Sequence, residues 1–409
     1  MSDIAGEGGG RATTTPAHDA PSQQTPGLVL PNQPSSPTVR TSPSTISAFG
    51  ASSPSGREKR ISSTASSVAS GSSLASLLTK LHHPQSASLS LEGKLKIRAT
   101  VDCGSDVLSC KFSPDGSVVA ASLRSGQVKF FTLTGIFSYL LQLPEDSSAD
   151  TSVFPVLSSP PATSIFWLPG GQPDAVLVTY SDGRVASWQG RKLGAQCTDG
   201  GVDVRGAVIS GMDGQVVTFN RKEVAVRDIK TLKAVTHMDQ GVGGQLIGRG
   251  AWWAVSGRGR ELVGGGNNLT WWDVRSGSVT RTVGGVHIRG PALSWHQNSN
   301  RIVSGSWGGG SDCVKIWEAT TARLTHVLHS DSANTCVYST TWAGKEGVAI
   351  GGSDPSLLRL STLDNTTMGV MSGIRASVWT IDAFLGRGHQ GTRLAVGCGP
   401  TLYLLDVLK

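Results

Sequence analysis

The sequence predicts an all-β protein: a seven-bladed β-propeller with a disordered N-terminal tail. Three observations lead to this prediction. A pair of an aromatic and an acidic residue recurs at a period of 40–45 residues, a second aromatic keeps step with it, and about ninety N-terminal residues have the composition of a chain that cannot fold. Glycine, which tight turns between short strands require, accounts for 52 of the 409 residues.

Residues 1–91 form the predicted disordered tail. Residues 12–73 are dominated by Ser, Thr, Pro, Ala and Gly, with no Trp and a single Phe, Phe49. Such a segment cannot bury enough apolar surface to offset the conformational entropy that folding costs. Leucines at helical spacing nevertheless predict a short helix over residues 73–83, which could dock into a groove, rest on its own domain or form only fleetingly. These leucines are Leu74, Leu77, Leu78 and Leu81.

The tail also contains candidate phosphorylation sites. Ser62 follows a basic pair at 59–60 with one residue between, a pattern that acidic kinase grooves recognise. Ser36, Ser42 and Ser53 each precede proline. Phosphate would add a charge of about −1.5 to −2 at each site, so we expect these residues to regulate the tail. The plain alternative is that Ser-Pro pairs are frequent in any tail of this composition.

From about residue 92 to 409, a strand-closing pair marks each predicted blade. Its full form is Trp272-Asp273, its near form Trp317-Glu318 and its weaker form Trp188-Gln189, with equivalent positions at Phe131, Arg227-Asp228, Leu360 and Leu405. The markers, at 131, 188, 228, 272, 317, 360 and 405, are separated by one step of 57 residues and five of 40–45. That period is typical of one four-stranded blade. A Ser/Pro-rich insertion loop at 138–161 explains the long step.

A second aromatic ends the predicted innermost strand of a blade, 18 to 22 residues before the pair. It is present as Phe112, Trp167, Trp295, Trp342 and Phe384. A turn and a small apolar strand, such as Ile302–Gly305, follow it. Because two markers keep phase over several units, chance is a poor explanation and a repeated blade is the better one.

These units resemble the WD-repeat (WD-40) family over roughly residues 92–409. In the best unit, Ile302–Ser306 and Val314–Glu318 look like the second and third strands of that family's blade. The family's turn Asp is present only as Asp182 and Asp354, and its opening Gly-His pair is essentially missing. These departures weaken the family's His–Ser–Trp–Asp brace within blades. The resemblance implies a non-catalytic scaffold whose rigid faces assemble a multiprotein complex.

The predicted ring is closed by a strand from upstream of the first blade. The C-terminal unit offers only three strands, near 378–383, 393–397 and 402–407, and an open ring would leave an exposed edge. Residues 94–101 alternate charged and apolar residues, as an outer edge strand does. We therefore expect residues 94–101 to complete blade 7.

The sequence argues against several classes of protein. It contains no phosphate-binding loop, zinc-protease motif or nucleophile elbow, so we expect no enzyme, no cofactor and no metal site. Six scattered cysteines without a C-x-x-C pair indicate free thiols in a reducing compartment. The absence of a secretory signal and of a long apolar run then favours the cytoplasm or nucleus.

Arginine is concentrated in one part of the predicted propeller. The formal net charge is +7, and seven Arg but only two acids lie from Arg249 to Arg301. If several reach one face, blades 4 and 5 would attract phosphorylated peptides, acidic lipid headgroups or nucleic-acid backbone; arginines on strands are, as a rule, solvated on the rim. The candidate partner-binding residues are Arg249, Arg258, Arg260, Arg275 and Arg289.

Two alternative functions remain open at this point. Trp272-Asp273-Val274-Arg275 resembles the W-D-x-R signature by which some WD-repeat proteins dock on the adaptor of cullin–RING ubiquitin ligases as substrate receptors. In that signature the Arg emerges from the bottom face, but the acidic residue expected upstream is here Gly266 or Asn267. The second alternative is a propeller that binds phosphopeptides or nucleic acid through its basic patch.

Overall fold

The structure is a computed structural model of the 409-residue chain. It describes residues 88–144, 159–169, 174–198, 204–209, 214–238, 252–296, 298–308, 312–329, 335–345, 347–353, 358–386 and 391–409. Almost all of the predicted tail lies outside these residues, with its helix at 73–83 and the candidate phosphorylation sites Ser36, Ser42, Ser53 and Ser62. Arg249 lies outside them as well.

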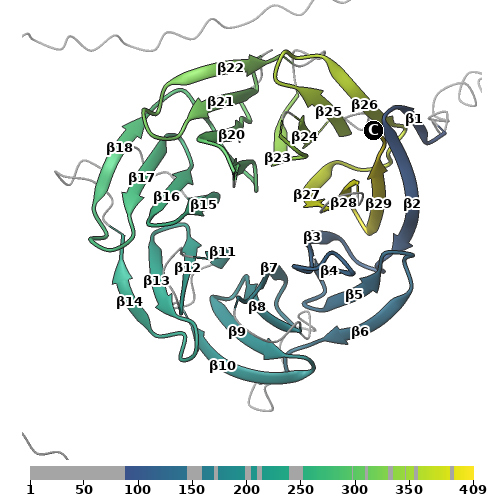
Figure 1. Ribbon diagram of the computed structural model, residues 1–409. Helices are drawn as coiled ribbons and strands as arrows, with labels where there is room; N and C mark the ends of the chain where they lie inside the picture. Colours follow the sequence, from purple (N-terminus) through teal and green to yellow (C-terminus); the bar gives the residue numbers. More distant parts are fainter. Residues whose placement is uncertain are drawn as a thin grey trace, which may run out of the picture. The chain divides into compact units, whose positions relative to one another are not determined.

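Seven antiparallel β-sheets surround a common axis in the described part of the chain, which contains no helix (Figure 1). Six sheets have four strands and one has five. Within each sheet, successive strands lie progressively farther from the axis (Figure 1). The protein is therefore an all-β, seven-bladed propeller, as the sequence predicts.

Blades 1 to 3 each consist of four consecutive strands, which follow one another from the axis outwards. Blade 1 contains β3 (Val107–Phe112), β4 (Val118–Leu123), β5 (Val128–Thr132) and β6 (Phe137–Leu141). Blade 2 contains β7 (Ala162–Trp167), β8 (Ala175–Tyr180), β9 (Arg184–Gln189) and β10 (Lys192–Thr198). Blade 3 contains β11 (Val204–Ile209), β12 (Gln215–Asn220), β13 (Val224–Asp228) and β14 (Ala234–His237).

Blades 4 to 6 follow the same plan, and blade 7 does so for three strands. Blade 4 contains β15 (Ala254–Arg258), β16 (Glu261–Gly265), β17 (Leu269–Asp273) and β18 (Val279–Val283). Blade 5 contains β19 (Leu293–Trp295), β20 (Arg301–Gly305), β21 (Val314–Glu318) and β22 (Leu324–Leu328). Blade 6 contains β23 (Val337–Trp342), β24 (Gly347–Gly352), β25 (Leu358–Thr362) and β26 (Thr367–Ser372). Blade 7 contains β27 (Val378–Leu385), β28 (Thr392–Cys398) and β29 (Thr401–Val407).

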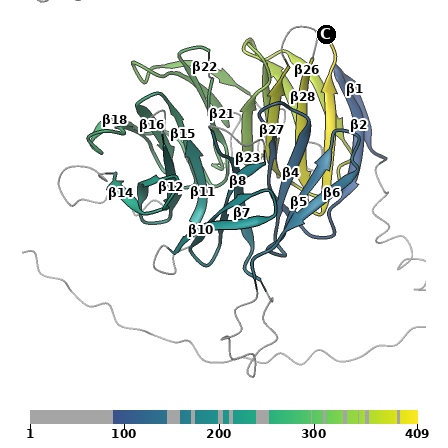
Figure 2. The same ribbon diagram turned by 60° about the horizontal axis from the view of Figure 1, so that its bottom comes forward.

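Two strands from upstream of blade 1 complete the last two blades. As predicted, β2 (Leu95–Asp102) pairs antiparallel with the C-terminal strand β29, from Leu95 opposite Val407 to Asp102 opposite Thr401. The sequence did not predict β1 (Ser90–Gly93), which adds a fifth strand to blade 6 by pairing with β26. Figure 2 shows β1 and β2 together at the rim beside the C-terminal strands. Strand β2 thus closes the ring at blade 7, and β1 extends the sheet of blade 6.

Two predicted boundaries need correction. The propeller begins at Ser90 rather than at residue 92, because β1 extends the sheet of blade 6. The insertion loop predicted at 138–161 starts too early, because residues 138–141 belong to β6. This strand has an uncharged sequence, Phe-Ser-Tyr-Leu-Leu, in which Phe137 and Leu140 are exposed, so it lacks the polar alternation that usually identifies an outer strand.

Both sequence markers lie where the repeat predicts them. All seven pair positions fall on the third strand of a blade, from Phe131 on β5 to Leu405 on β29. In blade 5 the Trp317 indole Nε1 donates to Ser304 Oγ on the neighbouring strand (2.8 Å). In blade 3 Arg227 Nε donates to Thr218 Oγ1 (2.8 Å). In both blades the residue opposite the donor is the second residue before the acceptor. Trp317 and Arg227 therefore make the same kind of cross-strand hydrogen bond, one from an indole and the other from a guanidinium.

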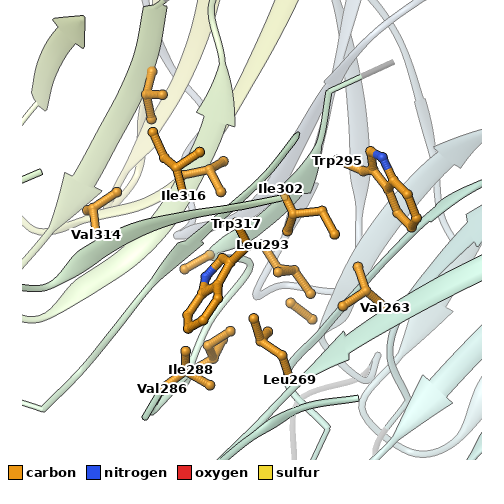
Figure 3. Packing of buried hydrophobic residues seen from close by; sticks show 14 of the residues in the cluster. Val263, Leu269, Val286, Ile288, Leu293, Trp295, Ile302, Val314, Ile316 and Trp317 are labelled. Atoms are coloured by element: carbon orange, nitrogen blue, oxygen red, sulfur yellow. The ribbon is translucent and has the colours of Figure 1, made fainter. Parts of the chain in front are cut away.

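Apolar clusters fill the spaces between neighbouring blades. The cluster in Figure 3 joins residues of blades 4 and 5, among them Val263, Leu269, Ile302 and Trp317, all at most 4% exposed. Trp271 and Trp272, adjacent on β17, are both fully buried, because their side chains point to opposite faces of the blade and reach different clusters. Since each blade buries both faces against its neighbours, no single blade is expected to be stable alone.

Side-chain hydrogen bonds also tie the innermost strands of neighbouring blades. Two of the innermost aromatic markers reach the preceding blade: Trp167 Nε1 donates to the carbonyl oxygen of Lys111 (3.4 Å), and Trp342 Nε1 to that of Ser294 (3.0 Å). Hydroxyl groups make further ties, since Trp295 N donates to Ser256 Oγ and Ile381 N to Ser339 Oγ, both at 3.0 Å. Hydrogen bonds from these two indoles and from backbone N–H groups thus link neighbouring innermost strands.

Candidate functional site at the channel mouth

The antiparallel strands divide the loops between two faces of the ring. Each innermost strand starts at one face, which we call the start face; it also carries the turns between second and third strands. Each innermost strand ends at the opposite face, the end face, with the turns between first and second and between third and fourth strands. A residue's position in the blade therefore decides which face it can serve.

In five blades the second residue of the innermost strand is a β-bulge. The register of this strand against its neighbour shifts there in blades 1, 2, 3, 6 and 7. A bulge leaves one residue unpaired and re-aims its side chain. The bulged residues are Leu108, Thr163, Arg205, Tyr338 and Trp379. Together with Trp253, Arg289 and Trp307, which also lie at the start face, they form what we call the channel mouth.

A cavity of about 520 Å3 lies on the axis of the ring. Residues on or directly before all seven innermost strands line it, including Leu108, Thr163, Arg205 and Trp253 of the channel mouth. Its charged lining residues are Lys111, Arg205 and Arg258, and no Asp or Glu is among the described residues that line it. The volume lies within the range of about 300–1,000 Å3 that small-ligand sites occupy.

One buried hydroxyl of the cavity wall makes no hydrogen bond within the described part of the chain. Thr340 on β23 is 2% exposed, lines the cavity, and its Oγ1 has no partner among the described residues. Leaving a buried hydroxyl unpaired costs about 1–3 kcal/mol, so the site offers a polar contact to whatever enters the channel.

A cationic group of side chains lies on the blade 3 and 4 side of the channel mouth. The Arg205 guanidinium carbon lies 3.4 Å from the centre of the Trp253 ring, and that of Arg289 lies 5.9 Å from it. Both are within the range of cation–π attraction. Arg289 Nη2 also donates to Asn267 Oδ1 (3.3 Å), a neutral acceptor. Burial and the charge of Arg289 lower the pKa of His287, so this neighbouring imidazole is neutral near pH 7.

An aromatic group lies on the blade 5 to 7 side. Tyr338 stacks on Trp379 with ring centres 4.3 Å apart and planes inclined by 20°, and Trp307 meets Tyr338 edge-on at 5.7 Å. Tyr338 is buried, whereas Trp307 is 38% and Trp379 42% exposed. Large aromatic side chains so exposed are the residue types that dominate binding energy in protein interfaces.

The loop from residue 284 to 292 connects these two groups. Trp307 N donates to the carbonyl oxygen of His287 (2.7 Å). A Cβ at Gly290 would overlap the carbonyl oxygen of Tyr338, so the loop packs directly against β23 at a position that only glycine fits. Arg289, between these two contacts, is therefore held between Trp253 and the aromatic group.

The arginines predicted from sequence do not form one patch. Arg258, Arg260 and Arg275 lie at the end of β15 and in turns of blade 4, all at the end face, and each is exposed. Arg289 lies at the start face. The reason is that successive turns of an antiparallel blade alternate between faces, so closeness in sequence does not place residues on one surface. Arg258 Nη1 donates to the carbonyl oxygen of Ser299 in the adjacent blade (2.9 Å).

The predicted Trp272-Asp273-Val274-Arg275 motif forms an ordinary strand end and turn. Trp272 is buried, and Asp273 Oδ1 accepts hydrogen bonds from the backbone N of Arg275 (3.1 Å) and of Ser276 (2.8 Å). These bonds, with that from the Ser276 hydroxyl, lower the pKa of Asp273. Arg275 is exposed and projects from the end face. The motif thus serves the turn and also presents its arginine to solvent.

Several titratable groups are committed to structural contacts. Lys111 Nζ donates to Asp382 Oδ1 (2.7 Å) across the seam between blades 1 and 7. Burial raises the pKa of the Cys110 thiol to about 12 and that of Cys398 to about 11. Within the described part of the chain, no three His, Cys, Asp or Glu side chains come together as metal ligands. Among the described residues, no helix has the length and apolar composition needed to span a membrane.

No protein-family model matches the chain, and no curated protein matches its sequence.

Sequence reasoning missed most of the channel mouth, although a signal for it exists. Leu108, Thr163 and Tyr338 each stand four residues before the innermost aromatic marker, and Trp379 stands five before Phe384. Reading the residues four and five before each marker would have singled out Tyr338 and Trp379. The bulge itself, and the exposure of Trp307 in a turn, are set by three-dimensional pairing and leave no comparable pattern.

Proposed function

We propose that this chain is a non-catalytic protein-interaction scaffold whose channel mouth binds a segment of a partner protein. The observation that carries the proposal is the pair of exposed tryptophans, Trp307 and Trp379, beside a cationic axial cavity. Tryptophan, tyrosine and arginine are the residues most enriched at the energetic centres of protein interfaces. A rigid ring of seven blades can present such a centre without a domain-scale movement.

We further propose that the propeller belongs to the WD-repeat class and works in the cytoplasm or nucleus. The hydrogen bond from Trp317 Nε1 to Ser304 Oγ supports the first part, since it reproduces the Ser–Trp half of that family's brace. Five marker steps of 40–45 residues and closure by β2 support it too. The compartment rests on cysteine usage, six scattered cysteines without a C-x-x-C pair.

The non-catalytic part of the proposal rests on how the titratable groups are used. His296 is buried, and its Nε2 donates to the carbonyl oxygen of Gly344 (3.2 Å). Asp382 is held by Lys111 and by the backbone N of Phe112 (2.9 Å). A general acid, base or nucleophile has to reach a substrate, whereas these groups hold blades together.

The proposal is tested by comparing captured partners for matched aromatic variants of the full chain. The Trp307→Ala/Trp379→Ala double variant removes the exposed tryptophans, and Phe137→Ala removes a 51% exposed phenylalanine from the outer strand β6. We expect the double variant to lose at least about tenfold of its partner binding, and Phe137→Ala to keep it. Quantitative mass spectrometry after cross-linking measures both. Equal partner profiles for the two variants would contradict the proposal.

A second candidate function is favoured by one observation, the exposure of Arg275 at the end face. In this alternative the chain is a substrate receptor that docks on the adaptor of a cullin–RING ubiquitin ligase through Arg275. A pull-down with purified adaptor distinguishes it, because Arg275→Ala should abolish retention and Arg260→Ala, from the same face, should not. Retention that is independent of Arg275 removes this candidate.

A further inference from the structure

We infer that the segment bound at the channel mouth is an acidic peptide with a large apolar side chain. The inference rests on the proposed function and names the chemistry of its partner. Two features of the mouth carry it: arginines at the start face that no described carboxylate neutralises, and an aromatic group whose exposed edges lie next to that charge.

Arg289 and Arg375 at the start face have no carboxylate partner among the described residues. Each described carboxylate of the start-face loops has a partner close by. Asp106 pairs with Arg124, Asp182 with Arg184, Glu223 with His237, Asp312 with His329, and Asp102 accepts from the backbone N of Gly104. Arg289 donates only to neutral Asn267 among the described residues, and Arg375 is exposed in the loop before β27. A ligand with carboxylates would therefore meet complementary charge at the mouth.

The axial cavity extends this preference inwards. Its described lining includes the hydroxyl groups of Thr340 and Thr380 and the side chains of Arg205, Arg258 and Lys111, of which Lys111 is paired with Asp382; no carboxylate is among the described lining residues. A carboxylate that enters can accept hydrogen bonds from hydroxyls as well as from a guanidinium, and charge-assisted bonds of this kind are about twice as strong as neutral ones. The unpartnered Thr340 hydroxyl provides one such donor.

The aromatic group requires an apolar side chain in the same ligand. Trp307 and Trp379 flank the buried Tyr338, so their exposed parts border one continuous patch across blades 5 to 7. Burying a large apolar side chain there contributes about 1.5–3 kcal/mol. The loop from 284 to 292 contacts Trp307 and Tyr338 and contains Arg289. The aromatic patch and Arg289 are therefore near enough for one short peptide to contact both.

The same geometry favours a peptide over single-stranded nucleic acid. Base recognition of that kind needs free aromatic faces as stacking platforms. Here one face of Trp379 stacks on Tyr338, and one face of Trp253 is covered by the Arg205 guanidinium, which leaves fewer ring faces for bases. A groove that follows a phosphate backbone also needs a track of cations, whereas the mouth clusters its cations on one side.

The experiment selects short random peptides displayed on phage against the full chain and then measures the affinity of selected peptides by fluorescence anisotropy. We expect the selected peptides to combine Asp or Glu with an aromatic or large aliphatic residue. Affinity should fall about three- to tenfold in Arg289→Gln, at least about tenfold in Trp379→Ala, and not at all in Arg260→Gln, a matched arginine of the end face. It should also weaken as salt is raised, because charges at a surface are screened.

The outcomes separate this inference from the proposed function. Selected peptides that are neutral or basic, yet still depend on Trp379, overturn the acidic chemistry and leave the proposed function standing. Peptides that bind without dependence on either exposed tryptophan overturn both. An oligouridine probe that binds with dependence on Trp379 and Arg289, and is not displaced by acidic peptides, overturns the inference in favour of nucleic acid.

Discussion

The seam between blades 7 and 1 carries a polar network beside its apolar cluster, whereas the seam between blades 3 and 4 has few polar contacts among the described residues. Across the first, Lys111 Nζ and the backbone N of Phe112 donate to the two carboxylate oxygens of Asp382, at 2.7 and 2.9 Å. The Cys110 thiol also donates to the carbonyl oxygen of Ala395 (3.3 Å). The channel side of this seam is thus a polar network.

The seam between blades 3 and 4 is mainly apolar. Trp272 of blade 4 packs with Phe219 and Val226 of blade 3 in one buried cluster, and Trp252 meets Trp272 edge-on with ring centres 4.8 Å apart. On the channel side this seam carries the contact of Arg205 with Trp253. The Arg205 side chain therefore belongs to the channel mouth as well as to this seam.

The difference follows from the distance along the chain that each seam has to span. Lys111 and Asp382 are 271 residues apart, and their seam joins the two ends of the ring. Closing so long a segment costs more conformational entropy than joining consecutive blades, and directional bonds also fix the register of closure. Blades 3 and 4 are consecutive, so no comparable closure has to be fixed there, and buried apolar surface makes up most of their contact.

The largest expected effect is at the apolar seam, from Trp272→Ala. The side chain is fully buried, so its removal leaves a cavity and should lower the free energy of unfolding by about 3–5 kcal/mol. Trp272→Phe keeps most of the packing and should cost less. Trp379→Ala, an exposed tryptophan, should change stability by no more than about 0.5 kcal/mol. Urea unfolding followed by circular dichroism measures all three; equal losses at positions 272 and 379 would show that the seam is not held by burial.

A smaller effect is expected at the closing seam, from Asp382→Ala. The side chain of Asp382 is 16% exposed, and its loss leaves the Lys111 ammonium and the Phe112 N–H without their acceptor, which should cost about 2–3 kcal/mol. Asp382→Asn keeps an acceptor for Phe112 and should lose less. The readout is the urea midpoint of each variant, and an unchanged midpoint in Asp382→Ala refutes the polar account of closure.

The closing seam should also respond to alkaline pH. Burial alone lowers the pKa of Lys111, but the Asp382 carboxylate and its hydrogen bond more than offset this and raise the pKa above its ordinary value. The stabilisation by this pair is therefore fully present below the ordinary lysine pKa of about 10.4 and is lost as pH rises through the folded value. Asp382→Asn should flatten this alkaline decline, which urea midpoints measured at rising pH would show.

The seam between blades 5 and 6 is sensitive to pH in the acidic direction. Burial lowers the pKa of His296, and the charges of Arg301 and Arg258 lower it further. Protonation then favours the unfolded chain, so stability is present above the ordinary histidine pKa of about 6.5 and declines as pH falls towards the folded value. His296→Gln removes the titration and keeps a donor for Gly344. Unfolding midpoints at neutral and mildly acidic pH should differ less in this variant than in the parent; an unchanged difference contradicts the assignment.

The features that the sequence predicts are those that repeat from blade to blade. The recurring markers, such as Trp317 and Trp342, predicted seven blades and their phase, because each kind of marker occupies the same strand position in its own unit. The closing strand β2 was predictable from a missing fourth strand. Features that depend on spatial neighbours were not: β1 pairs with a strand far along the chain, and the predicted arginines divide between two faces. Trp307 and Trp379 form one site although 72 residues separate them.

The smallest expected effect on stability is at Arg205, and it tests whether the apolar seam leaves its polar groups for a ligand. A cation–π contact contributes about 0.5–1 kcal/mol, so Arg205→Gln should shift the urea midpoint only slightly. The same variant should weaken binding of a selected acidic peptide about three- to tenfold, because a cation is lost from the mouth. Arg205→Lys keeps the charge but loses the planar stack and should retain more binding than Arg205→Gln. A large loss of stability with unchanged binding would mean that Arg205 belongs to the seam, and the contrast between the two seams would fail.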